Sequence, residues 1–118
     1  MHLEITAEVL IKQLGFEVNE SLLKKAQNVI DNTEGFDKFA NHLISLNDFL
    51  KHVNGYIDFS NSYDYLKIVE EEASQEINTE FEDKVQSWAN KYNIKLALAD
   101  HTKQNHRKVY YIKGVYKT

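Results

Sequence analysis

Apolar residues in the first half of the chain recur every three to four positions, the spacing of one face of an α-helix. This pattern predicts a short helix over Ala7–Leu14 and a second helix from Glu20 to about Asp31. Thr6 and Asn19 precede these segments as N-caps, and Gly15 is placed to end the first helix in the left-handed conformation. The apolar face of the second helix consists of Leu22, Leu23, Ala26, Val29 and Ile30.

A third and longer helix is expected between Thr33, as its N-cap, and the pair Asn54-Gly55. Its apolar residues are Phe36, Phe39, Ala40, Leu43, Ile44, Leu46, Phe49, Leu50 and Val53. A helix with so wide an apolar surface contacts other elements on more than one side, so we expect it at the centre of the core. Thr79 and Glu82 match a capping box and predict a fourth helix that ends at Asn93.

From Tyr56 the apolar residues alternate with polar ones, which is the period of a β-strand. The alternation predicts a hairpin whose turn contains Ser60, Asn61 and Ser62. Its apolar positions are Ile57, Phe59, Leu66 and Ile68. A third strand is expected over Ile94–Leu98, and a fourth from Lys108 to about Val115.

The expected order is therefore α-α-α-β-β-α-β-β, an α+β fold in which an antiparallel sheet of about four strands packs against helices. We expect one domain over residues 1–118, with a helical part over about 1–54 and a ββαββ part over about 55–118. Three helices followed by a hairpin also occur in winged-helix proteins. Residues 36–53 lack the basic and polar surface of a DNA-recognition helix, so winged helix remains the minor alternative.

Composition excludes several classes of protein. The chain has no cysteine, which rules out disulfides, thiolate metal sites and cysteine nucleophiles. It contains neither a basic, apolar leader nor about 18 consecutive apolar residues, so we expect a cytoplasmic protein that does not span a membrane. No nucleophile elbow and no phosphate-binding glycine loop occur in it. We therefore expect a protein that is not an enzyme and needs no cofactor.

The formal charge of −4 is unevenly divided along the chain. Residues 1–90 contain 17 acidic and 7 basic side chains, whereas residues 91–118 contain 1 acidic and 7 basic side chains. Seven of the acids fall within fourteen residues: Glu70, Glu71, Glu72, Glu76, Glu80, Glu82 and Asp83. Such a surface is typical of an inhibitor, immunity protein or chaperone that binds a basic partner. A protein partner bound through these acids is our first hypothesis.

The basic C-terminal segment supports an alternative. Lys103, Arg107, Lys108 and Lys113 are interleaved with tyrosines, among them Tyr111. Cations bind phosphates and flat rings stack on bases, so this hairpin is a candidate nucleic-acid contact.

Three weaker possibilities remain. Asp100, His101 and His106 have side chains suited to a metal, but too few ligands lie nearby, and we expect no metal site. A small-ligand pocket could involve Tyr63, Tyr65 and Ala97. An exposed strand edge or the tyrosines could also pair two copies in a homodimer.

Overall fold

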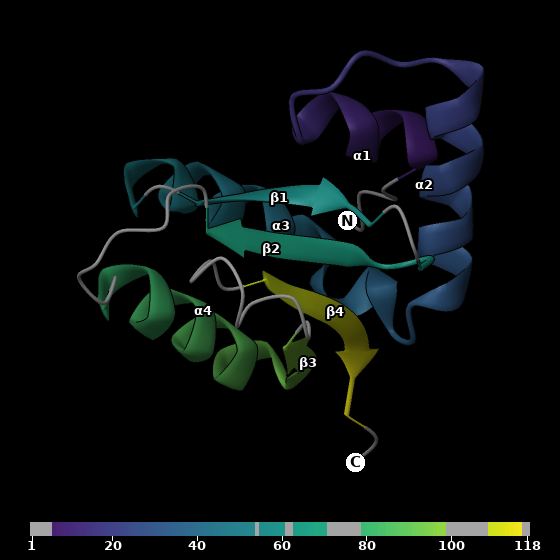
Figure 1. Ribbon diagram of the computed structural model, residues 1–118. Coiled ribbons are helices and arrows are strands. Elements are labelled where there is room, and N and C mark those ends of the chain that lie inside the picture. The colour runs from purple at the N-terminus through teal and green to yellow at the C-terminus, as the bar shows by residue number, and fades with distance from the viewer. Residues whose placement is uncertain (1–5, 54, 61–62, 71–78, 99–108, 117–118) are drawn as a thin grey trace.

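The computed structural model describes residues 6–53, 55–60, 63–70, 79–98 and 109–116 (Figure 1). Four α-helices, one short 3-10 helix and four strands occur in this part of the chain. In order they are α1 (Ala7–Gln13), α2 (Glu20–Asn32), α3 (Phe36–Leu50), η1 (Lys51–Val53), β1 (Gly55–Phe59), β2 (Leu66–Glu70), α4 (Thr79–Tyr92), β3 (Ile94–Leu98) and β4 (Val109–Val115). The predicted α+β class and the predicted order of elements are confirmed.

The first two helices begin at the predicted caps. The side-chain oxygen of Thr6 accepts a hydrogen bond from the N–H of Val9 at 3.3 Å, and that of Asn19 accepts one from Leu22 at 2.8 Å. These oxygens satisfy backbone donors that have no partner within the helix. Gly15 follows α1 with a φ of 90°, the left-handed conformation that was predicted for it.

The predicted N-cap of α3 is wrong. The helix begins after Gly35, which has a φ of 70°, and the side chain of Thr33 caps nothing. The cause is a contact far away in sequence: Glu34 accepts a hydrogen bond from the N–H of Val115 at 2.9 Å. The backbone beside it approaches so closely that a Cβ on Gly114 would lie 2.7 Å from the carbonyl oxygen of Glu34. Pairing with β4 therefore delays the start of the helix.

The strands form one antiparallel sheet in the order β1-β2-β4-β3. β4 therefore lies between β2 and β3, and α4 connects those two strands (Figure 1). One row across the sheet runs through Ile57, Ile68, Tyr110 and Leu98. The next row runs through Asp58, Lys67, Tyr111 and Ala97. Because side chains of successive residues point to opposite faces, these two rows lie on different faces of the sheet.

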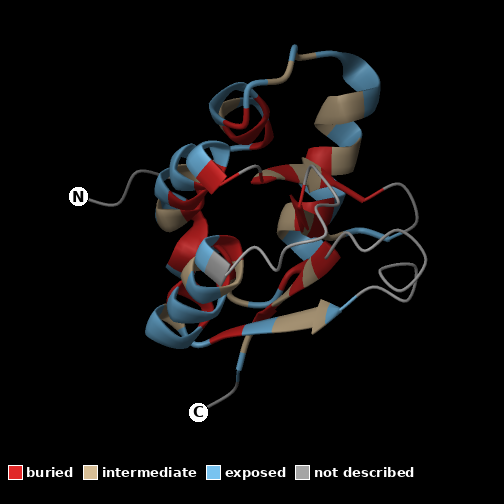
Figure 2. Ribbon diagram, turned by 60° about the vertical axis from the view of Figure 1, so that its left-hand side comes forward, coloured by how far each residue is buried: buried red, intermediate tan, exposed pale blue. Residues whose placement is uncertain are grey.

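The core lies between one face of the sheet and helices α3 and α4, where the buried residues gather (Figure 2). Phe39 of α3 is fully buried and packs edge-on against Trp88 of α4, with ring centroids 6.1 Å apart. Asn47, also buried on α3, accepts a hydrogen bond from the N–H of Ile57 at 3.0 Å. A polar side chain thus ties the central helix to the edge strand β1.

The winged-helix alternative is wrong. The hairpin of β1 and β2 is not a separate wing, because it forms half of a four-stranded sheet completed by β4 and β3, and α4 lies between the two halves in sequence. None of the helices in the described part of the chain has the length and apolarity needed to cross a membrane.

Candidate functional site

The face of the sheet that points away from the core carries a mixture of tyrosines and lysines. Strand alternation places these residues on it: Tyr56 and Asp58 on β1, Lys67 and Val69 on β2, Lys95 and Ala97 on β3, and Val109, Tyr111 and Lys113 on β4. Apart from the two buried valines, each of these side chains is half-buried or exposed. We call this set, together with Tyr63 and Tyr65 of the β1–β2 turn, the outer sheet face.

The rings of the outer sheet face are held by contacts with one another and with the valines. Val69 and Val109 form a small apolar cluster against which Tyr56 and Tyr111 pack. Tyr63 meets Tyr111 edge-on, with ring centroids 5.5 Å apart and planes at 79°. Because 58% of Tyr63 is exposed, its ring offers a flat surface to solvent.

Two lysines of the outer sheet face lie beside aromatic rings, whereas Lys67 lies opposite Asp58 in the register of β1 and β2. The ammonium of Lys113 lies 4.3 Å from the ring centre of Tyr65, and that of Lys95 lies 5.8 Å from the ring centre of Tyr116. Among the described residues neither these lysines nor Lys67 forms an ion pair. Aromatic rings attract a cation without neutralising its charge. Lys95 and Lys113 therefore keep their positive charge among the described residues, and Lys67 shares its part of the face with Asp58.

A polar cluster lies on the opposite, core-facing side. The hydroxyl of Tyr110 donates a hydrogen bond of 2.6 Å to Glu82 of α4, and Gln86 donates one of 3.3 Å to the same oxygen. Burial raises the pKa of the Tyr110 hydroxyl above its ordinary value of 10.0, and the hydrogen bond to Glu82 and the charge of Glu70 raise it further. The cluster joins α4 to the sheet through a hydroxyl that stays protonated.

Replacing Tyr110 with phenylalanine removes the donor to a half-buried carboxylate and is expected to lower the free energy of unfolding by about 1–3 kcal/mol.

The folded protein holds the Tyr110 proton more tightly than the unfolded chain does. The contribution of the Tyr110 hydroxyl to the free energy of unfolding is therefore fully present below pH 10.0 and is lost as the pH rises above that value. Urea unfolding at pH 8 and pH 11 measures both effects. Tyr63→Phe, at an exposed position, is the control, and an equal alkaline loss in Tyr110→Phe and the wild type would contradict the assignment.

The acidic residues of the first hypothesis occupy different environments. Glu80 and Asp83 are exposed near the start of α4. Glu70 is 6% exposed, and Glu82 is turned toward Tyr110, so neither lies freely on the surface. Glu71, Glu72 and Glu76 lie outside the described residues.

Of the basic hairpin, the structure describes Tyr111 and Lys113, and both lie on the outer sheet face. Lys103, Arg107 and Lys108 lie outside the described residues, as do Asp100, His101 and His106. No group of three metal-ligating side chains occurs within the described ranges. Sequence reasoning did not assign Lys67 and Lys95 to this surface. The alternation of residues along β2 and β3 indicated which face of its own strand each lysine occupies. Only the order of the strands in the sheet brings these lysines beside Lys113.

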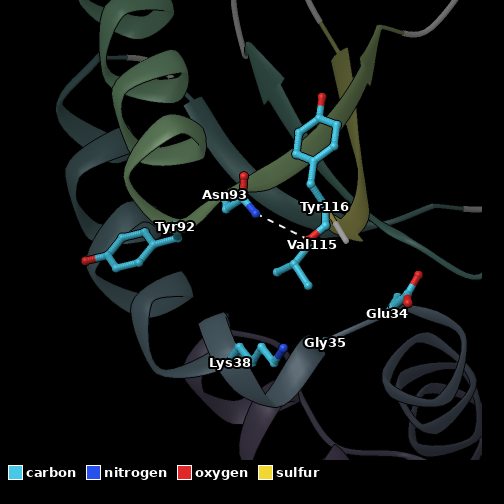
Figure 3. A pocket seen from close by; sticks show the side chains of 7 residues that line it. All are labelled: Glu34, Gly35, Lys38, Tyr92, Asn93, Val115 and Tyr116. Atoms are coloured by element: carbon cyan, nitrogen blue, oxygen red, sulfur yellow. Dashed lines mark hydrogen bonds between the residues drawn. The ribbon is translucent and has the colours of Figure 1, made fainter. Parts of the chain in front are cut away.

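A broad hollow of 710 Å³ lies beyond the end of β4 (Figure 3). It is lined by Glu34, Gly35, Lys38, Tyr92, Asn93, Val115 and Tyr116. Asn93, with a φ of 59°, donates its side-chain N–H to the carbonyl of Tyr116 at 3.3 Å and accepts the N–H of Tyr116 at 2.9 Å. These groups hold the end of β4, and the rim carries both signs of charge. The hollow therefore favours no class of ligand, and it does not include Tyr63, Tyr65 or Ala97.

Comparison of the chain with protein-family models, with curated proteins and with solved structures finds no match, so the outer sheet face has to be interpreted from its own chemistry.

Proposed function

We propose that this protein binds single-stranded nucleic acid through the outer sheet face. The observation that carries the proposal is the interleaving of lysines with tyrosine rings on the sheet face opposite the one against which α3 and α4 pack, with Lys113 4.3 Å from the ring of Tyr65. These lysines form no ion pair with a described residue. Single strands are commonly recognised by a positively charged surface whose aromatic side chains stack on successive bases. No catalytic group is required for this activity.

The shape of the surface favours a single strand over a duplex. Stacking requires that the faces of the bases be open, and paired bases within a duplex hide those faces. Duplex readers usually insert a helix into the major groove, whereas here the two central helices are packed against the sheet. The net charge of −4 does not oppose binding strongly, because charges more than about 8 Å away are largely screened at physiological salt.

The proposal predicts binding that weakens with salt. Lys67, Lys95 and Lys113 can each neutralise one phosphate of a single strand. The logarithm of the association constant K then falls with the logarithm of the salt concentration with a slope of about −2 or steeper. Affinity then falls roughly twentyfold between 50 and 200 mM salt. Fluorescence anisotropy with a labelled single-stranded oligonucleotide measures this slope, and a duplex of the same sequence serves as the comparison. Tighter binding to the duplex, or no binding at 50 mM salt, would reject the proposal.

A protein partner is the second candidate. The exposed carboxylates Glu80 and Asp83 favour it, because neither forms an ion pair with a described residue. If a protein partner binds through these acids, we expect its complex with this protein to survive nuclease treatment and to be lost in the double variant Glu80→Lys/Asp83→Lys. An association that nuclease abolishes belongs to the outer sheet face instead.

A further inference from the structure

A second site lies between the two core helices, on the side of the molecule that the proposed nucleic-acid surface does not use. Helices α3 and α4 border a groove of 270 Å³. Its polar lining consists of His42 and Ser45 from α3, and Lys84, Ser87, Trp88 and Lys91 from α4. Leu46 and Tyr92 complete it with apolar surface. Each polar side chain in the lining can donate a hydrogen bond, and none is a carboxylate.

The two lysines keep their charge available. The ammonium of Lys84 lies 4.4 Å from the ring centre of Phe49, and that of Lys91 lies 5.5 Å from the ring centre of Tyr92. Neither forms an ion pair with a described residue. Seven residues of helix separate them by about 10 Å along the axis of α4, with Ser87 between them on the same side. Positive charge therefore flanks a hydroxyl at the centre of the groove.

Two further features indicate that the groove is prepared for a ligand. The imidazole of His42 is stacked on the ring of Tyr92, with centroids 4.0 Å apart and planes at 13°, which fixes its direction. Trp88 is 6% exposed, and its indole N–H has no acceptor in the described part of the chain. A buried donor without an acceptor costs about 1–3 kcal/mol, and a ligand oxygen that reached it would supply the missing partner.

We infer that this groove binds a small anionic ligand carrying a phosphate group. A lining of cations and donors without carboxylates selects for negative charge, and lysine is a common phosphate ligand. The volume is below the roughly 300–1,000 Å³ of sites for drug-sized molecules, so the ligand is small. The site is independent of the proposed function, because it uses none of the residues of the outer sheet face.

Trp88 is the only tryptophan of the chain and lines the groove, so its fluorescence reports on the site directly. The protein is titrated with inorganic phosphate and with pyrophosphate at constant ionic strength, with chloride as the balancing anion. We expect a saturable change in emission and an affinity at least tenfold weaker in Lys84→Gln/Lys91→Gln. Backbone amide shifts of Ser45 and Ser87 give a second readout should the emission change be small.

The charge-matched control is Lys24→Gln/Lys25→Gln on α2, which should bind phosphate as the wild type does. Oligonucleotide binding by Lys84→Gln/Lys91→Gln should also remain at the wild-type level, which separates a free phosphate ligand from the backbone of a nucleic acid. The inference is overturned if neither readout saturates, or if the groove variant and the control respond alike.

Discussion

Replacing Phe39 with alanine is expected to lower the free energy of unfolding by about 3–5 kcal/mol, the range found when a buried aromatic side chain is truncated. Phe39 is fully buried near the start of α3, where its ring contacts both Phe36 and Trp88. Two effects contribute to this loss of stability: the apolar ring is no longer buried, and a cavity is left in the core. It is a large fraction of the 5–15 kcal/mol that typically stabilises a domain.

Phe49 provides a matched control on the same helix. It is 39% exposed and its ring contacts the ammonium of Lys84, so Phe49→Ala is expected to lower the free energy of unfolding by about 1 kcal/mol. Urea unfolding of both variants, followed by circular dichroism, measures the difference. Equal losses in the two variants, or a loss below 1 kcal/mol in Phe39→Ala, would show that α3 is not the central helix of the core.

Local sequence signals located most of the fold. Asn19 and Thr6 cap helices because their side-chain oxygens satisfy donors only three residues away. Asn93 ends α4 in the left-handed conformation, where the pattern expected the helix to stop. These features depend on neighbours in the sequence, so residue type and spacing were enough to find them.

Features that depend on distant residues could not be found in this way. The start of α3 is set by the backbone pairing between Glu34 and Val115, which are far apart in the sequence. The buried position of Glu70 has the same origin. The run of acids suggested a surface, but strand pairing turns this carboxylate to the core side. Alternation separates the two faces of a strand, and only the strand order decides which strands share a face.

The candidate site illustrates the same limit. Lys113 lies over the ring of Tyr65 because β4 pairs with β2, and β4 is preceded in sequence by β3 rather than by β2. The sequence indicated Tyr111 and Lys113 as possible nucleic-acid contacts. Their neighbours Lys67, Tyr63 and Tyr65 join them only through this crossover.

Changes to the outer sheet face are expected to have the largest effect on binding. Tyr63 is exposed and meets Tyr111 edge-on, so its ring can stack on a base while its loss leaves the core intact. Removal of one stacking ring costs about 1–3 kcal/mol, which corresponds to a roughly fivefold to 150-fold loss of affinity for Tyr63→Ala. Anisotropy titrations with a single-stranded oligonucleotide measure the loss, and Phe49→Ala, which removes an exposed ring from α3, is the control. Unchanged affinity in Tyr63→Ala would exclude stacking on this ring.

The salt dependence of Lys67→Gln/Lys113→Gln tests the proposed surface most directly. Glutamine keeps much of each side chain's length and removes only the charge, and Lys24→Gln/Lys25→Gln changes the net charge by the same amount at α2. Removal of two phosphate contacts to a single strand should reduce the slope of log K against log salt by about 1.4. We expect this reduction in Lys67→Gln/Lys113→Gln and a wild-type slope in the control. The same reduction in both variants, or none in either, would contradict binding at the outer sheet face.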